Sequence, residues 1–578
     1  MFNLPTSSWA DYDKALISRG GGVYPRDAKR ITLSKAAQGA LGVAQEEWEP
    51  EALISAILKA PVDLLWFGGI GTYVKAAAEN NAAVGDPSND ALRVDGADVR
   101  AKVIGEGANL GVTQAGRIEF ALKGGRLNTD FIDNSAGVDC SDNEVNIKIA
   151  LAPVQRAGKL SQERRNALLE RMTDEVAEIV LEDNRDQALA LSIAESGGAD
   201  AVESFIHLIN TLEGHNAVDR RTEGIADNDL LSRRAADGQG LTRPELAVLL
   251  SSAKLLLQDN IERDDPAIEG PYEALLLGAF PKPMQEHYAK AIRQHRLRRE
   301  IVATKLANRV VNRLGILHPF ELAEEEGASL GQVGAAYLIV ETLLGIDRLW
   351  EEIEAAPMPE AARLLLLGRL ALAMRSEMAD LLRTGLPLRS PEDVLTAVRP
   401  GVIELGTNTR ELLAPQGRQH SARILKALEE LGAPKHLAQR VAHLFDMDGA
   451  IGVANLARNI GIDAHALASI FIALGEKLGL DWAQGTAAVM NPSDVWERLL
   501  VAGLARDFQQ LRLDFLQRLA RRKSSRSDLA AAVKGWIEEH AQAIALFRTM
   551  IERAQREGGV TAPMLAQIAS MARNLLSR

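Results

Sequence analysis

"AKVIGEGANLGVTQAGRIEFALKGG", residues 101–125, contains a short apolar run, a glycine-rich turn and an amphipathic segment in direct succession. The run and the glycines that close it predict a buried strand. The segment after the turn predicts a helix that Thr113 caps and that ends at Gly124. "RLNTDFIDN", residues 126–134, is expected to return as a second strand. A strand, a helix and a strand in this order predict a parallel sheet with a right-handed crossover.

The residues before this segment extend the pattern. "PEALISAILKAP", residues 50–61, predicts a helix with Pro50 in its first turn, and "VDLLWFG", residues 62–68, predicts a buried strand. Ligands of parallel sheets gather at the carboxyl ends of the strands. Three turns are predicted there, and we expect them to face one crevice: "GGIGTY", residues 68–73, "GEGANLG", residues 105–111, and "DNSAGVDCS", residues 133–141.

After about Ala150 the apolar residues recur at helical spacing, and strand patterns nearly vanish. "LTRPELAVLL", residues 241–250, is typical, because Thr242 and Glu245 have the spacing of a capping box. The predicted fold class is therefore α/β followed by all-α. We assign the α/β part to residues 1–150 and a helical region of two or more bundles to residues 151–578.

Composition limits the classes of protein. The chain has 578 residues, 47% apolar and 25% charged, which indicates a folded globular protein of several domains. A net charge of −12 argues against a nucleic-acid partner. No stretch approaches the roughly 20 apolar residues of a membrane span, so we expect no membrane partner. The single cysteine is compatible with a reducing compartment, which favours the cytoplasm.

Several motifs suggest a ligand without defining one. "GGIGTYV" places Gly69 and Gly71 as in a dinucleotide fingerprint but has Val74 at the third position, and "GEGANL" is half a fingerprint in the same way. Each alone is more often a tight turn, but two in one sheet favour a nucleotide. "FDMDGAIG", residues 445–452, lacks the spacing of a calcium loop, and no metal site is predicted. "RQHRLRRE", residues 293–300, is expected to form ion pairs with acidic neighbours.

"EGAN", residues 106–109, and "DNSAGVDCSDNE", residues 133–144, resemble two motifs of the glutamate dehydrogenases. The second motif matches that family at Asn134, Gly137, Val138, Ser141 and Glu144. Further sequence segments resemble the very large bacterial NAD-specific glutamate dehydrogenases, as the C-terminal part of a longer polypeptide. These segments are "LISRGGGVYPRDAKRI", residues 16–31, "DLLWFGGIGTYVKA", residues 63–76, "NIKI", residues 146–149, "LTRPELAVLL", and "HRLRREIVATKLANRVVNRLG", residues 295–315.

The resemblance implies a partial Rossmann-like sheet with NAD as cofactor. It implies that Asn109 and Asn134 hold the nicotinamide end of NAD and that Ser141 binds the distal carboxylate of L-glutamate. The half fingerprint at Gly69 and Gly71 predicts that these two glycines also contact the cofactor. The implied reaction is oxidative deamination of L-glutamate to 2-oxoglutarate and ammonium by a homo-oligomer. The family's catalytic lysine and aspartate would lie upstream, so no catalytic residue is assigned and the chain alone is expected to be inactive.

Two other readings stay open. The chain could be a helical interaction or regulatory module with a nucleotide-fold remnant, or a dehydrogenase of another amino acid. If the early strands of the sheet lie elsewhere, the strands present here should leave an unpaired edge and an exposed apolar face.

Overall fold

The structure is a computed structural model that describes residues 8–388, 390–407, 409, 415–490, 492, 494–522, 528–556 and 559–577. The chain divides into two compact units. The N-terminal unit comprises Met1–Lys148, Arg165–Val202 and Thr211–Ser252, and the helical unit comprises Ile149–Arg164, Glu203–Asn210 and Ala253–Arg578. The boundary expected at residue 150 stays a prediction.

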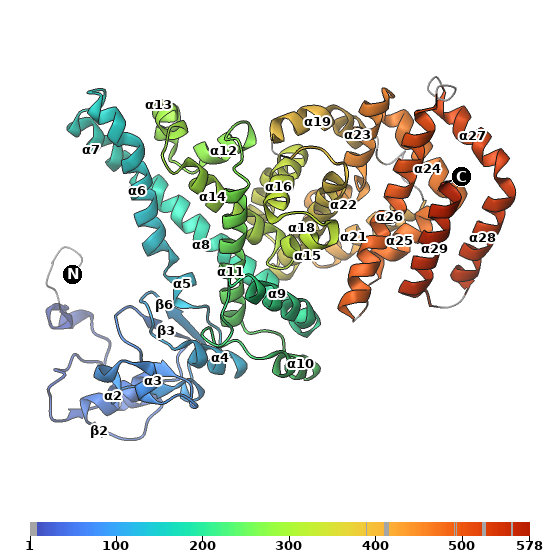
Figure 1. The fold of residues 1–578 in the computed structure, drawn as a ribbon. Coiled ribbons are helices and arrows are strands. Elements are labelled where there is room, and N and C mark those ends of the chain that lie inside the picture. The colour runs from blue at the N-terminus through green and yellow to red at the C-terminus, as the bar shows by residue number, and fades with distance from the viewer. Residues whose placement is uncertain are drawn as a thin grey trace. The chain divides into compact units, whose positions relative to one another are not determined.

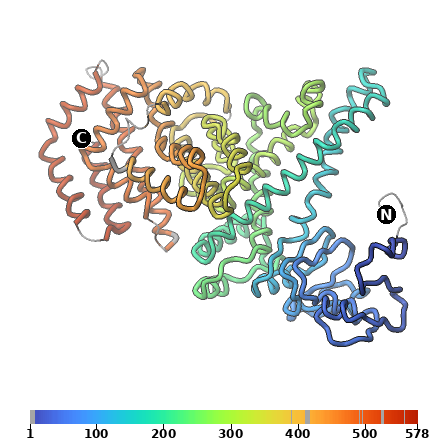
Figure 2. Tube along the Cα trace, turned by 180° about the vertical axis from the view of Figure 1, so that it is seen from behind, coloured from blue at the N-terminus to red at the C-terminus, as the bar shows by residue number. Residues whose placement is uncertain are grey.

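The strands lie in the first part of the chain, and helix follows helix in the rest (Figures 1 and 2). The strands are β1 Ile31–Thr32, β2 Glu47–Trp48, β3 Leu64–Phe67, β4 Val74–Lys75, β5 Val94–Asp95 and β6 Val103–Glu106. The helices up to residue 263 are α1 Lys35–Leu41, α2 Pro50–Leu58, α3 Asn81–Val84, α4 Gln114–Leu122, α5 Asp130–Asp133, α6 Ser135–Arg156, α7 Gln162–Arg171, α8 Thr173–Glu195, α9 Val202–Gly214, α10 Asn228–Ala236 and α11 Arg243–Arg263.

The later helices all belong to the helical unit. They are α12 Pro271–Gly278, α13 Lys282–Arg293, α14 Arg298–Leu314, α15 His318–Glu326, α16 Leu330–Leu344, α17 Ile346–Ala355, α18 Glu360–Arg383, α19 Pro391–Thr407, α21 Pro415–Glu430, α22 Lys435–Asp446, α23 Ala450–Ile460, α24 Ala464–Leu478, α25 Leu480–Val489, α26 Val495–Ala520, α27 Leu529–Glu539, α28 Ala541–Arg556 and α29 Ala562–Leu576. Short 3-10 helices are η1 Trp9–Asp11, η2 Lys14–Leu16, η3 Pro87–Asn89, η4 Gly96–Asp98 and η5 Gly198–Ala201.

The central pair of strands is parallel, as the sequence predicts. Leu64 lies opposite Val103 and Phe67 lies opposite Glu106, while β4 pairs with β5, also in parallel. The predicted helices are present as α2 and α4, and the Thr113 hydroxyl caps α4 by accepting a hydrogen bond from the Gly116 N–H. The helices and strands enclose one apolar core of Leu58, Phe67, Val74, Val94, Val99, Ala101, Ile104, Val112, Phe120 and Leu127.

The strand predicted over residues 126–134 is wrong. Arg126 makes a single parallel bridge to Val103, after which the chain turns into α5. Two aspartates of α5 direct this turn, because the Asp133 carboxylate accepts the Glu106 N–H at 3.0 Å and the Asp130 carboxylate accepts the Leu110 N–H at 2.8 Å. Side chains that bind the backbone in this way favour turns and helix starts over strands. Residues 135–141 are correspondingly the first turns of α6 and not a loop.

The β3–β6 pair has the exposed apolar face that the sequence predicts. Within the described residues, β3 pairs with β6 and has no strand on its other edge. Leu64, Trp66 and Val103 share one face, and they are 55%, 57% and 37% exposed. An unpaired parallel strand with bare apolar side chains is unusual in a complete sheet, where helices cover both faces.

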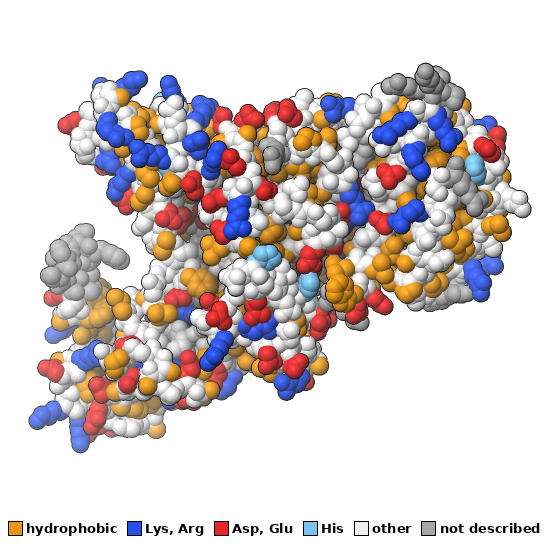
Figure 3. All heavy atoms as spheres, viewed as in Figure 1, with side chains coloured by type: hydrophobic (Ala, Val, Ile, Leu, Met, Phe, Trp, Pro, Cys, Tyr) orange, Lys and Arg blue, Asp and Glu red, His pale blue; other side chains and the backbone are white. Residues whose placement is uncertain are grey.

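The helical unit confirms the expected ion pairing in residues 293–300. Arg293 contacts Glu273 at 2.7 Å, and Arg299 contacts Asp265 at 2.5 Å. Figure 3 shows Asp and Glu side chains interspersed among Lys and Arg on the visible face. No single helix in the described residues is long and apolar enough to cross a membrane, although the bent pair α15 and α16, at 109°, meets that test jointly.

Candidate functional site

The structure brings together the two asparagines that the sequence singles out. Asn109 lies in the turn after β6, and Asn134 is the residue that ends α5. The Asn134 side-chain amide donates a hydrogen bond to the Asn109 side-chain oxygen at 2.7 Å. This bond uses one donor of Asn134 and one acceptor site of Asn109. The pair therefore still presents the Asn109 NH2 as a donor and the Asn134 oxygen as an acceptor.

Hydrogen bonds from backbone N–H groups to two carboxylates hold the turn that carries Asn109. Leu110 has a φ of 58°, which is uncommon outside glycine, and its N–H is held by Asp130. The Val112 N–H donates to the Glu106 carboxylate at 3.1 Å. A turn held at both ends by buried or half-buried carboxylates keeps one conformation, so Asn109 is preorganised.

These carboxylates share one buried arginine, which sequence reasoning missed. Arg117 of α4 binds both oxygens of Glu106, at 2.7 and 2.9 Å, and approaches Asp130 at 3.0 Å. Arg117 and Glu106 are 3% and 1% exposed. Burial raises the pKa of Glu106, while Arg117 acts to lower it. The available signal was a lone glutamate at the end of an apolar strand with a lone arginine inside the next helix.

The "GGIGTY" turn adjoins the same loop. The Tyr73 N–H donates to the Gly111 carbonyl at 2.9 Å. Gly71 has a φ of +128°, and a Cβ there would meet the Asn89 amide at 2.6 Å, so this position requires glycine. A Cβ on Gly69 would meet nothing within 4 Å. The first two predicted turns therefore lie together, and the Asn109–Asn134 bond joins the start of α6 to them.

Trp66 lies over the glycines of β6 and its turn. A Cβ added to Gly105 or Gly107 would come within 2.5 or 2.4 Å of the indole. Both glycines are thus needed for the ring to lie against the backbone, and the indole remains 57% exposed. Trp66 is a natural fluorescence reporter of this loop.

Ser141 occupies a different place from the one expected. It lies inside α6, whose first residue is Ser135, and its hydroxyl donates to the Gly137 carbonyl at 3.4 Å. Free backbone N–H groups occur only in the first turn of a helix, so none lies beside Ser141. The Ser135 hydroxyl at the true start of α6 accepts hydrogen bonds from Asn184 and Gln187. Ser141 itself is exposed.

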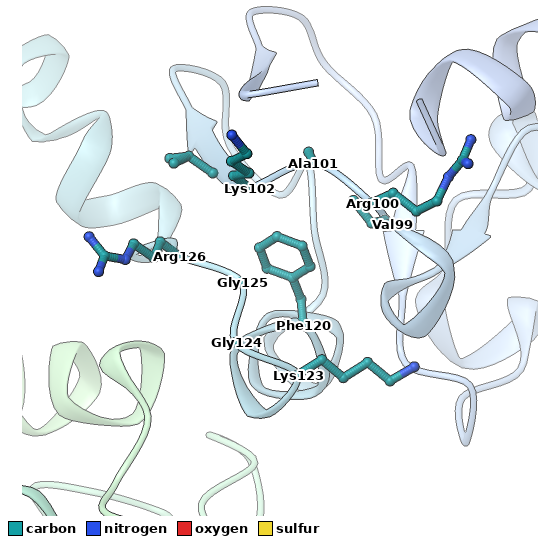
Figure 4. A pocket seen from close by; sticks show the side chains of 10 residues that line it. Val99, Arg100, Ala101, Lys102, Phe120, Lys123, Gly124, Gly125 and Arg126 are labelled. Carbon is teal, nitrogen blue, oxygen red and sulfur yellow. The ribbon is translucent and has the colours of Figure 1, made fainter. Parts of the chain in front are cut away.

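A cavity of about 580 Å³ lies at the opposite end of β6 from Asn109. Arg100, Lys102, Lys123 and Arg126 line it around the Phe120 ring (Figure 4). Three of these cations already have partners: Arg100 donates to the Lys59 and Leu41 carbonyls, Lys102 pairs with Asp63, and Lys123 donates to the Ala97 carbonyl. Because the strand ends that bind ligands in parallel sheets are the carboxyl ends, we place the candidate site at Asn109.

No group of three or more His, Cys, Asp or Glu side chains in the described part of the chain is arranged to hold a metal ion. Cys140 is a free thiol on the exposed side of α6.

Parallel strands, loops gathered at their carboxyl ends and a long helical continuation define a protein with an α/β part and an all-helical part. Residues 1–194 match the family described as bacterial NAD-glutamate dehydrogenase, catalytic domain. Residues 238–574, more than half of the chain, match the family described as glutamate dehydrogenase, C-terminal. The chain belongs to the glutamate dehydrogenase family that this second match defines.

Three curated relatives are each named NAD-specific glutamate dehydrogenase. That of Pseudomonas aeruginosa PAO1 is 38% identical over 98% of this chain and 35% of its own length. That of Halomonas elongata is 36% identical over 96% of this chain and 34% of its own length. That of Mycobacterium tuberculosis H37Rv is 38% identical over 86% of this chain and 31% of its own length. The chain thus spans about a third of the length of these relatives.

Proposed function

We propose that this chain takes part in the NAD-dependent oxidative deamination of L-glutamate to 2-oxoglutarate and ammonium, as the end of a Rossmann-like nucleotide domain followed by a helical region. The family assignment supports the reaction class. The Asn109–Asn134 hydrogen bond carries the proposal for the site, since the structure joins two residues that the sequence assigns to one cofactor contact.

The chemistry of this asparagine pair fits the nicotinamide end of NAD. A primary carboxamide has one oxygen that accepts and one NH2 group that donates. The pair offers the complementary set, with the Asn109 NH2 as donor and the Asn134 oxygen as acceptor. Gly69 and Gly71 would leave the neighbouring backbone open to the cofactor. When bound, NAD supplies the acceptor for the hydride removed from the α-carbon of glutamate.

The remaining assignments rest on the same proposal. Ser141 binds the distal carboxylate of glutamate from the exposed side of α6. The chain works in a cytoplasmic homo-oligomer. The bare β3 edge is suited to pairing with further parallel strands.

Asn109→Ala is expected to weaken NAD binding. One lost hydrogen bond, and the partner amide left unpaired, should raise the Kd about 5- to 30-fold. The measurement is a titration of intrinsic fluorescence with NAD in a longer polypeptide that includes the upstream residues, with Trp66→Phe identifying the Trp66 contribution. Asn574→Ala, an exposed asparagine of α29, serves as the control and should leave the Kd unchanged. An unchanged Kd in Asn109→Ala would remove this residue from the site.

The 578-residue chain assayed alone is expected to show no NAD-dependent glutamate oxidation. The general acid/base residues that the reaction needs are assigned to none of its side chains. The assay follows NADH absorbance with saturating glutamate, and the longer polypeptide is the positive control. Formation of NADH by the chain alone would contradict the assignment of the catalytic residues to a part of the polypeptide outside this chain.

A further inference from the structure

The helical unit contains a carboxylate that is buried without a partner. Glu377 of α18 is 1% exposed, and neither of its carboxylate oxygens has a hydrogen-bond partner within the described residues. Asp380, one turn later on the same helix, is 7% exposed. An isolated buried carboxylate is costly in its charged form, and such groups usually remain protonated.

A third carboxylate faces the same place from another element. Asp448 lies in the turn between α22 and α23, and the Ser376 hydroxyl donates to it at 2.6 Å. Asp448 is exposed, so the cluster reaches solvent on this side. We call Glu377, Asp380 and Asp448 the acid cluster.

The cations near the acid cluster are engaged with other acids. Several arginines of α18 and of neighbouring helices have carboxylate partners outside the cluster: Arg375 with Glu321 and Glu325, Arg383 with Glu326 and Asp507, Arg506 with Glu325 and Glu326, Arg309 and Arg313 with Glu341, and Arg512 with Asp481. His420 of α21 is near enough to Asp448 for the carboxylate to act to raise its pKa, but burial lowers the pKa of this histidine overall. Among the described residues no cation forms an ion pair with Glu377 or Asp380, although Arg506 and Arg383 lie near enough to act to lower the pKa of Asp380.

A metal ion does not supply a counter-charge, since no set of carboxylates in the described ranges has the arrangement of a metal site. The remaining way to neutralise buried carboxylates is a proton. Burial raises the pKa of Glu377 well above its ordinary range, with Asp380 and Asp448 adding to the effect. Burial also raises the pKa of Asp380 to about 8, against the lowering effect of Gln509.

The cluster is linked to neighbouring helices by side-chain amides. Gln509 of α26 donates to Asp380 at 2.9 Å, and Gln484 of α25 donates to Gln509 at 3.4 Å. Gln484 in turn accepts a hydrogen bond from Arg512, which binds Asp481 at 2.5 Å. A Cβ on Gly449, beside Asp448, would meet the Gln509 amide at 2.4 Å, so this glycine gives Gln509 its room.

We propose that the acid cluster is a proton-binding site that holds α18 to α26 and to the α22–α23 turn, and that its loss of protons at alkaline pH loosens this packing. The acid cluster belongs to the helical unit, and the proposal does not depend on the proposed cofactor contacts.

The sign of the pH dependence follows from the raised pKa values. A carboxyl whose pKa is higher in the folded than in the unfolded state contributes stability below the unfolded pKa and loses it as pH rises through the folded pKa. For Asp380 this loss builds up progressively from the ordinary carboxyl range to about pH 8 and is complete above that value. The melting temperature of the whole chain should therefore fall by several degrees between pH 6 and pH 9.

Glu377→Gln tests the proposal, because glutamine has the shape of the protonated acid without its titration. We expect the variant to melt several degrees above the unchanged chain at pH 9 and to show a flatter dependence of melting temperature on pH. Glu351→Gln removes the same charge from an exposed position on α17 and should follow the unchanged chain. A Glu377→Gln variant that is less stable at pH 9, or that keeps the full pH dependence, overturns the proposal.

Infrared spectroscopy gives a second readout that needs no stable variant. The unchanged chain should show the C=O stretch of a protonated carboxylic acid at pH 7, and this band should disappear as pH rises through the unfolding transition. The absence of such a band at pH 7 overturns the proposal, whatever the melting curves show.

Discussion

Replacing Arg117 with methionine is expected to lower the free energy of unfolding of the N-terminal unit by about 3–5 kcal/mol, the usual cost of leaving one member of a buried ion pair without its partner. Glu106, 1% exposed, would then face Asp130 with no cation between them. The measurement is chemical denaturation followed by fluorescence, since Trp66 lies against the β6 backbone and reports on this region.

The pH dependence of Arg117→Met separates electrostatics from lost packing. Burial already raises the pKa of Glu106, and removing Arg117 removes the main influence that lowers it. If the pKa of Glu106 is higher in the folded than in the unfolded state, stability falls as pH rises. The free energy of unfolding lost in Arg117→Met should therefore be larger at pH 8 than at pH 5. A deficit equal at both values would assign the loss to packing alone.

Two further variants serve as controls for Arg117→Met. Arg26→Met removes an exposed arginine from the same unit and should cost less than about 0.5 kcal/mol. Adding Glu106→Gln to Arg117→Met removes the buried charge and should recover part of the stability. A double variant that loses the sum of the two single losses would show that Glu106 and Arg117 are not coupled.

The central strand, turn and helix could be predicted because local signals agree with the tertiary structure. β6 is an apolar run closed by glycines, and Thr113 caps α4 as its position indicates. The order strand, helix, strand over residues 101–134 predicts a parallel sheet, whereas the parallel pair that forms is β3 with β6. Where periodicity, capping and turn residues all favour one structure, sequence reasoning succeeds.

Residues 126–141 could not be predicted in the same way, because their structure depends on distant partners. Asp130 and Asp133 accept hydrogen bonds from backbone groups in and after β6, and these bonds turn the chain into α5. The motif match placed Asn134 correctly beside Asn109, but it gave no information about helix boundaries. A shared motif fixes which residues meet, whereas the surrounding hydrogen bonds fix the backbone between them.

The buried charged side chains Arg117 and Glu377 could not be predicted from the sequence either. Neither Arg117 nor Glu377 is distinguishable in the sequence from a charge on a solvated helix face. Arg117 is matched by acids from β6 and α5, while Glu377 meets only other carboxylates. The first arrangement fixes a loop and the second binds protons, and only the three-dimensional contacts separate them.

Ser141→Val is expected to lower kcat/KM for L-glutamate about ten- to one-hundred-fold in a longer polypeptide that carries the upstream catalytic residues, since hydrogen bonds to charged groups contribute about 1.5–3 kcal/mol. Ser141 is exposed, and its hydroxyl makes only a long bond of 3.4 Å to the Gly137 carbonyl, so the group is available to a ligand. Because valine is apolar, the variant should also lose less activity toward an amino acid with an apolar side chain.

Ser141→Thr keeps the hydroxyl and should retain most of the glutamate activity, which makes it the matched control for Ser141→Val. The discriminating comparison is between KM for glutamate and Kd for NAD, because a substrate-binding hydroxyl affects the first and a general disturbance of α6 affects both. Asn134 lies at the start of α6, so a distortion of the helix would reach the asparagine pair and weaken NAD binding in parallel. Equal losses in both constants would therefore place the effect of Ser141 in the packing of α6 and remove it from the substrate site.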